Sequence, residues 1–134
     1  MKNQTTPKPR VYVAGPYSCQ RRCRGIGVSL KAMREGIQAS REIIYEGMIP
    51  FCPWLDFMWA LLDEEGLLSK EWFYEYTSSF LVVCDVVYIH KIEKGSQGTL
   101  NEMLLAEKNG IPVVNSFKRL LSWRNKWIQR QQKV

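Results

Sequence analysis

The chain has 134 residues, enough for one domain with a single sizeable core. Hydrophobic residues make up 46% and charged residues 24%, a balance that argues against a disordered or collagen-like chain. No apolar run approaches the roughly 18 residues of a membrane span, and the polar start at residues 1–10 lacks the apolar core of a secretory signal. We therefore expect a cytoplasmic protein without membrane contact.

Strand and helix patterns alternate along the chain. Strands are indicated by short β-rich runs, and helices by apolar residues at helical spacing that end at glycine. Ser69 is a typical N-cap residue for one of these helices. In chain order we predict a strand at 11–15, a basic loop at 17–27, a helix at 28–45, a strand at 48–51, an aromatic short helix or loop at 53–62, a helix at 69–80, a strand at 85–89, a polar loop at 91–97, a helix at 98–109 and a strand at 111–114.

The apolar runs of these strands are continuous, which is typical of parallel strands covered on both faces. We therefore predict an α/β three-layer sandwich with a mostly parallel four- to five-stranded sheet, flavodoxin/Rossmann-like in architecture. The α/β domain is expected at 10–116, after a flexible N-terminus at 1–9. In such open sheets ligands bind at the carboxyl ends of the strands.

The net charge of +6 is concentrated in the last segment, 117–134, which holds six basic residues and no acidic one. Apolar residues recur there at helical spacing, so we predict a basic amphipathic C-terminal helix. Such a helix either docks on the domain or on a partner subunit, or it binds a nucleic acid or an acidic membrane. We favour docking and do not expect a nucleic-acid partner, because one basic segment is weak evidence.

The four cysteines and the single histidine give no metal-ligand pattern. Cys19 and Cys23 are four residues apart and no paired CxxC motif occurs. Free thiols in a reducing compartment explain the cysteines better than a zinc site. We expect neither a metal nor a cofactor.

The segment from Gly95 to Glu102 carries the most specific pattern of the chain. Small residues let a backbone approach a ligand closely, and the free N–H groups at a helix start bind anions. Glu102 follows Ser96 and Gly98 closely enough to face the same pocket. A phosphate cradle beside a carboxylate suits a phosphorylated sugar whose anomeric carbon develops positive charge. The alternative is a structural helix start with a capping serine and acid.

Three segments resemble a known family: Val-Tyr-Val-Ala-Gly-Pro-Tyr-Ser at 11–18, Cys-Asp-Val-Val-Tyr-Ile at 84–89 and Ser-Gln-Gly-Thr-Leu-Asn-Glu at 96–102. They are similar to the nucleoside 2-deoxyribosyltransferase-like superfamily, which includes the 2'-deoxynucleoside 5'-monophosphate N-glycosidases. The third segment also resembles the Gly-Gly-x-Gly-Thr-x-x-Glu motif of cytokinin-activating phosphoribohydrolases. Both families cleave the N-glycosidic bond of nucleotides.

The resemblance implies a hydrolase that releases a free base and (deoxy)ribose 5-phosphate. Glu102 would attack C1', and Tyr12 would orient its carboxylate. Ser96 and Gly98 would hold the 5'-phosphate, and a serine instead of an acid at position 96 favours a nucleotide over a nucleoside. A deoxyribosyltransferase and a non-catalytic nucleotide-binding protein are the alternatives. Further candidate binding residues are Gly15, Tyr17, Thr99 and Arg21, the last with Arg22 and Arg24 in a basic loop that either closes over the substrate or is merely solvated.

One position departs from the family pattern. The family has an aspartate eight residues before the position of Asp85, where it helps to protonate the leaving base, and Thr77 stands there in this chain. Asp56 and Glu75 are the possible replacements, although Glu75 is not cleanly directed at the same place. Loss of the acid would leave a slow enzyme, since a positioned acid contributes about 10²–10⁴-fold, or a nucleotide-binding protein.

Four of the five tryptophans lie in residues 54–62 and 117–134. Trp54 and Trp59, with Phe57 and Met58, either stack on a base or belong to the core or an interface. Because interfaces are enriched in tryptophan and arginine, we expect a homodimer or larger assembly through one of the two segments. Relatives in the family often borrow active-site residues from a neighbouring chain. His90, at the end of a predicted strand, either contacts the ligand or is structural.

Overall fold

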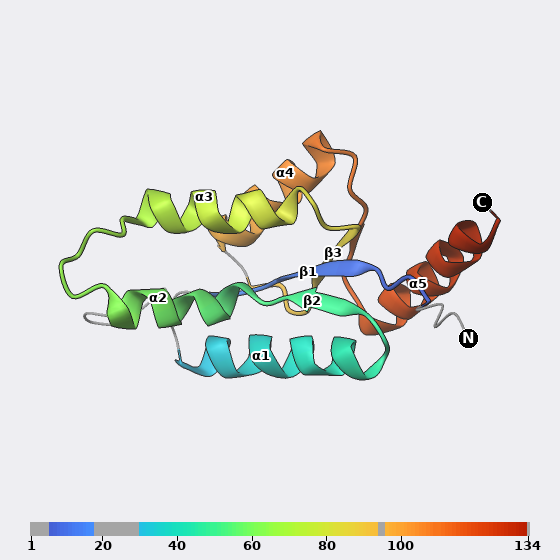
Figure 1. Cartoon of the computed structure of the whole chain (residues 1–134), viewed down its shortest axis with the longest axis horizontal. Helices are drawn as coiled ribbons and strands as arrows, with labels where there is room; N and C mark the ends of the chain where they lie inside the picture. Colours follow the sequence, from blue (N-terminus) through green and yellow to red (C-terminus); the bar gives the residue numbers. More distant parts are fainter. Residues whose placement is uncertain (1–5, 18–29, 94–95, 134) are drawn as a thin grey trace, which may run out of the picture.

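The computed structural model describes residues 6–17, 30–93 and 96–133 (Figure 1). Gly95 and the three arginines of the basic loop, Arg21, Arg22 and Arg24, lie outside the described residues. The elements are β1 (Arg10–Ala14), α1 (Leu30–Tyr45), β2 (Ile49–Phe51), the 3-10 helix η1 (Pro53–Asp56), α2 (Phe57–Leu62), α3 (Lys70–Leu81), β3 (Val86–Ile89), α4 (Gln97–Lys108), β4 (Val113–Val114) and α5 (Phe117–Gln132).

The four strands form one parallel sheet in the order β2-β1-β3-β4. This confirms the predicted α/β sandwich of the flavodoxin/Rossmann type. Strand β1 is central, and its Tyr12 lies between Phe51 of β2 and Val87 of β3. The chain moves to one side of β1 for β2 and to the other side for β3. The carboxyl ends of β1 and β3 therefore form the switch point at which such sheets bind ligands.

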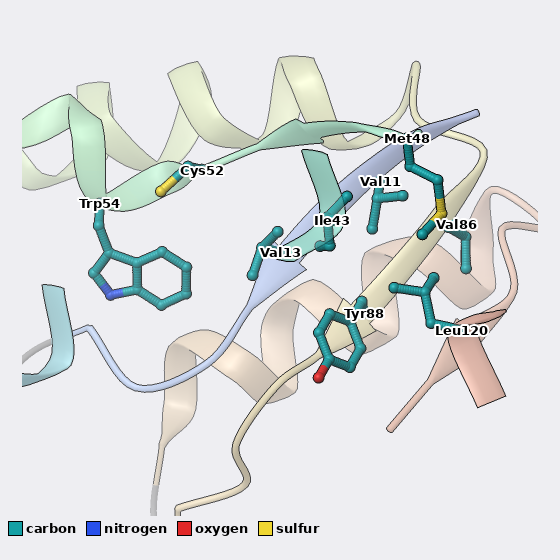
Figure 2. Packing of buried hydrophobic residues seen from close by; sticks show 9 residues of the cluster. All are labelled: Val11, Val13, Ile43, Met48, Cys52, Trp54, Val86, Tyr88 and Leu120. Carbon is teal, nitrogen blue, oxygen red and sulfur yellow. The ribbon is translucent and has the colours of Figure 1, made fainter. Parts of the chain in front are cut away.

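Successive side chains of β1 enter two separate cores, one on each face of the sheet. Val11 and Val13 pack with Ile43 of α1 and Leu120 of α5 (Figure 2). Tyr12 points to the opposite face, which α3 and α4 cover. The core on that face consists of Tyr12, Ala14, Leu81, Cys84, Val87, Ile89 and Ala106. Glu102 belongs to α4, so the strand pattern alone brings Tyr12 to the layer that carries Glu102.

Trp54 fills the core between η1 and α1. Its side chain is 1% exposed, and its indole N–H donates to the carbonyl of Pro16 at 3.0 Å. Gly36 of α1 lies against the ring, because a Cβ atom there would sit 2.3 Å from it. Trp54 is therefore a core residue, and neither base stacking nor a subunit contact holds for it.

Helix α5 docks on its own domain, as expected. Leu120 is fully buried, and Phe117, Leu121 and Trp123 pack against the same core. Arg124 forms an ion pair with Glu46 at 2.9 Å and also donates to the Glu46 carbonyl at 3.0 Å. In the described parts of the chain, no helix combines the length and apolarity needed to cross a membrane.

The amino end of β1 is held on both sides. Pro9 is buried, and its carbonyl accepts the N–H of Ile49 at 3.0 Å. Asp85 accepts the N–H of Arg10 at 2.7 Å, so this acid is structural. The terminus expected to be flexible, 1–9, thus already belongs to the fold at Pro9.

Helix α2 differs from the other helices because none of its residues is buried. Met58, Trp59, Leu61 and Leu62 are all exposed, Leu62 to 75%. Together with the start of α3, this helix projects beyond the carboxyl edge of the sheet (Figure 1). These four residues, with exposed Leu55 before them, are called the α2 apolar face below.

Candidate active site

The switch point is closed by Gly15 and His90, which follow β1 and β3. A Cβ atom on Gly15 would lie 2.4 Å from Nε2 of His90, so a glycine is needed there. The His90 ring meets Trp54 edge-on with centroids 5.3 Å apart. Burial lowers the pKa of His90, which keeps the imidazole neutral at neutral pH. Both residues are therefore packed at the base of the site, and Nε2 of His90 is buried there without a hydrogen-bond partner among the described residues.

Glu102 and Tyr12 lie together on the α3/α4 side of the sheet. Oε2 of Glu102 is buried and has no hydrogen-bond partner among the described residues, although the residue as a whole is only half-buried. Burial raises the pKa of Glu102 to about 8, and a hydrogen-bonding interaction with Tyr12 opposes that rise. The pKa of Tyr12 is raised well above 10.0, first by burial and then by the charge of Glu102. The Tyr12 ring is held in place by stacking on Phe51 at 5.5 Å.

Thr77 of α3 completes this group. Its hydroxyl interacts with Tyr12 and lowers the pKa of that phenol, while it donates to the carbonyl of Phe73 at 3.1 Å. The position predicted from the family spacing is therefore at the site, but it holds a hydroxyl group and not an acid.

Glu75 is not part of the site. Its side chain is exposed, and it lies two positions before Thr77, a rotation of about 200° around the axis of α3. Since Thr77 faces Tyr12, Glu75 points away from it. The structure thus removes Glu75 as a candidate acid.

Asp56 remains as the second acid. It ends η1 just after β2, is 5% exposed, and accepts a hydrogen bond from the Tyr17 hydroxyl. Burial raises the pKa of Asp56, and the bond from Tyr17 opposes the rise. Asp56 also raises the pKa of Tyr12 through its charge, as Glu102 does more strongly. The two carboxyl groups therefore act on the same phenol.

The start of α4 is open toward a ligand. Ser96 occupies the N-cap position, but its side chain caps no backbone N–H and contacts the Thr99 hydroxyl at 2.9 Å instead. By contrast, the N-cap serines of α3 and α5, Ser69 and Ser116, each accept a backbone N–H at 3.1 Å. A Cβ atom on Gly98 would meet open space. The first N–H groups of α4, which have no intrahelical partner, are thus left uncapped by Ser96.

These observations argue against the alternative interpretation of residues 96–102 as a helix start capped by a serine and an acid. The first turn of α4 contains no acidic residue, because Glu102 lies one turn further along. Glu102 therefore does not cap the helix start. Neither Ser96 nor Glu102 makes the bond that a capping box requires.

Comparison of the chain with protein-family models, curated proteins and solved structures gave no match. Among the described residues, no three His, Cys, Asp or Glu side chains gather as metal ligands would. Cys52 and Cys84 are buried free thiols, and burial raises the pKa of Cys84 to about 11. The site consequently rests on Tyr12, Glu102, the start of α4, and the pair formed by Tyr17 and Asp56.

The pairing of Tyr17 with Asp56 escaped the sequence analysis, which named both residues separately. The two follow β1 and β2, whose carboxyl ends are neighbours in a parallel sheet. If the first two predicted strands had been paired in parallel, the segments that follow them would have been expected to lie side by side, which would have indicated a contact between Tyr17 and Asp56.

Proposed function

We propose that the protein hydrolyses the N-glycosidic bond of a (deoxy)nucleoside 5'-monophosphate and releases a free base and (deoxy)ribose 5-phosphate. The observation that supports this most is the buried, unpaired Oε2 of Glu102 beside Tyr12. An unsatisfied buried carboxylate oxygen costs stability, and functional sites are where such costs persist.

Glu102 would act as the nucleophile. Burial disfavours its ionised form. A sugar whose C1' gains positive charge as the base departs would favour the ionised form. Tyr12, which interacts with the carboxylate and is itself held by Phe51, would keep the attacking oxygen in one orientation.

The start of α4 would bind the 5'-phosphate. Uncapped N–H groups at a helix start favour an anion, Gly98 leaves room for it, and the hydroxyl groups of Ser96 and Thr99 are close by. Glu102 lies four residues beyond Gly98, which is about 6 Å along the helix axis. The phosphate and the attacked carbon of one nucleotide would thus lie along the same helix.

A nucleotide-binding protein without catalysis is the second candidate. Thr77 favours this candidate, because it places a hydroxyl group near Tyr12 at the position where the family that the sequence resembles has an acid. Such a protein would bind monophosphates at the start of α4 without releasing the base.

Incubation with a panel of ribo- and deoxyribonucleoside monophosphates, with chromatographic detection of free base, separates the two candidates. We expect base release by the wild type, loss by orders of magnitude in Glu102→Gln, and no change in Glu107→Gln, an exposed position on the same helix. Addition of a second free base tests transfer against hydrolysis. Nucleotide binding without base release by the wild type would contradict hydrolysis and support the binding protein.

We also propose a homodimer through the α2 apolar face. Trp54 and the apolar residues in the first half of α5 are packed inside the domain, and the most exposed apolar residues of the two segments considered lie in α2. Because the α2 apolar face carries no charge, it can pack against the same face of a second copy in a two-fold symmetric dimer.

A further inference from the structure

Departure of a nucleobase requires a proton, and the expected proton donor is absent. Thr77 stands at its position, and the Thr77 hydroxyl donates to a backbone carbonyl. A hydroxyl group of ordinary acidity does not protonate a leaving base at neutral pH. If the proposed hydrolysis takes place, the proton must come from another group near Tyr12 and Glu102.

Asp56 is the acid that we consider for that role. It is buried, it lies at the carboxyl edge of the sheet just after β2, whose Phe51 pairs with Tyr12 of β1, and its charge acts on the ionisation of Tyr12. Its neighbour Tyr17 belongs to the segment that follows β1, and the Trp54 indole holds this segment through the Pro16 carbonyl. Asp56 and Glu102 thus reach Tyr12 from different elements, η1 and α4.

We propose that Asp56 is the proton donor to the leaving base and that Tyr17 is the positioning residue that directs its carboxyl group. This inference rests on the proposed function and adds its second catalytic group. In this proposal Asp56 of η1, at the carboxyl edge of the sheet, takes the role of the acid that is missing from α3.

The described surroundings of Asp56 favour its neutral form more than water does. Among the described residues, the titratable groups that act on it or that it acts on are Tyr17 from the segment after β1, Tyr12 from β1, and Cys52 from the end of β2. None of these three is a cation that would stabilise the carboxylate. Burial raises the pKa of Asp56 in the same direction.

The two steps balance as follows. In the first, an oxygen of ionised Glu102 forms a bond to C1', the C1'–N bond breaks with its electron pair on the base nitrogen, and the Asp56 proton moves to the base. In the second, water attacks C1', the ester bond breaks with its electron pair returning to Glu102, and the water proton moves to Asp56. The products are neutral base and sugar phosphate, and both carboxyl groups regain their initial states.

The decisive experiment compares two leaving groups. Asp56→Asn keeps the size of the side chain and still accepts the Tyr17 hydrogen bond, but it carries no proton to give. We expect base release from a nucleoside monophosphate to fall by about 10²–10⁴-fold. The kcat/KM for nitrophenolate release from a 4-nitrophenyl glycoside of the same sugar phosphate should change by less than about tenfold, because it reports only the first step, in which a nitrophenolate leaves without protonation. Glu75→Gln, at an exposed acid of α3, serves as the matched control and should match the wild type on both substrates.

Tyr17→Phe provides the second variant, which preserves the ring and removes only the hydroxyl. Loss of a hydrogen bond to ionised Asp56 raises the pKa of Asp56. Compared with the wild type, one limb of the kcat/KM pH profile should therefore move to higher pH, while the other limb, set by Glu102, stays in place. A role limited to packing would move neither limb. This variant decides the question if Asp56→Asn does not fold, as judged by its thermal unfolding.

The outcomes separate the two proposals. If the wild type hydrolyses neither the nucleotides nor the nitrophenyl glycoside, the proposed function fails and the inference fails with it. If the wild type is active in a Glu102-dependent way and Asp56→Asn slows both substrates equally, or neither, only the inference is overturned. Slowing confined to the nucleotide supports it.

Discussion

Replacement of Glu102 by glutamine is expected to stabilise the protein at neutral and alkaline pH. The folded chain raises the pKa of this carboxyl group from 4.5 to about 8. The folded state therefore retains the proton over a pH range in which the unfolded chain has lost it. The contribution of Glu102 to stability is complete below pH ~4.5 and is lost as the pH rises toward ~8. Glutamine has the same shape and does not titrate.

The magnitude follows from the size of the shift. Each pKa unit corresponds to about 1.4 kcal/mol, so ionised Glu102 reduces the free energy of unfolding by about 5 kcal/mol above pH ~8. At pH 7 the reduction is about 3 kcal/mol, because part of the range has not been crossed. Compared with a total stability of about 5–15 kcal/mol for a domain, this is a large effect. A glutamine also adds a constant offset, so the quantity to compare is the change with pH.

Urea unfolding of the wild type, Glu102→Gln and Glu107→Gln at pH 5, 7 and 9 measures this change. We expect the advantage of Glu102→Gln over the wild type to grow by about 4 kcal/mol between pH 5 and pH 9. The Glu107→Gln control, exposed on the same helix, should show no such growth. Parallel pH dependences of the wild type and Glu102→Gln would refute the assignment of Glu102 as a buried acid.

Three further predictions concern packing, substrate and assembly. Gly36→Ala should lower the free energy of unfolding in urea by about 1–3 kcal/mol, because its Cβ would meet Trp54 at 2.3 Å. Gly98→Ala, whose Cβ would meet open space, should leave the stability equal or slightly higher and should weaken nucleotide binding. Equal stabilities of the two variants would contradict this. Monophosphates should be preferred to the matching nucleosides, and inorganic phosphate should compete in the same assay; better turnover of nucleosides would exclude a phosphate site at α4. Trp59→Asp should convert the dimer to a monomer of 15.7 kDa, as measured by light scattering. Removal of α5 should instead unfold the domain, because Leu120 is lost from the core. A monomeric wild type with full activity would disprove the dimer.

Much of the fold followed from local chemistry. Ser69 caps α3 as predicted. Gly47 and Gly110 end α1 and α4 in the positive-φ conformation, with φ of 78° and 68°, that favours glycine at helix ends. Continuous apolar runs correctly indicated that β1 and β3 are buried on both faces, whereas the edge strands β2 and β4 contain no buried residue.

The remainder depended on contacts between distant segments. The family spacing led to Thr77, which does interact with Tyr12, but the direction of Glu75 depends on how α3 is rotated about its axis. Trp54 lies in a segment whose other apolar residues are largely exposed. It is buried because Gly36, 18 residues earlier, leaves room for its ring. Asp56 gains its partner from the segment after another strand. In each case the deciding neighbour is specified by tertiary packing and not by the local sequence.

The docking of α5 has a consequence for synthesis of the protein. Leu120 lies in the same core as Val86 and Tyr88 of β3, so the part of this sheet face that α5 covers stays exposed until residues 117–132 have left the ribosome, even after α1 has packed on the rest. A nascent chain that already contains all four strands still exposes apolar surface, which invites aggregation or chaperone binding. Folding of the sheet face opposite the candidate site is thus tied to the end of translation of this segment, while the α3/α4 face that carries Tyr12 and Glu102 is covered earlier.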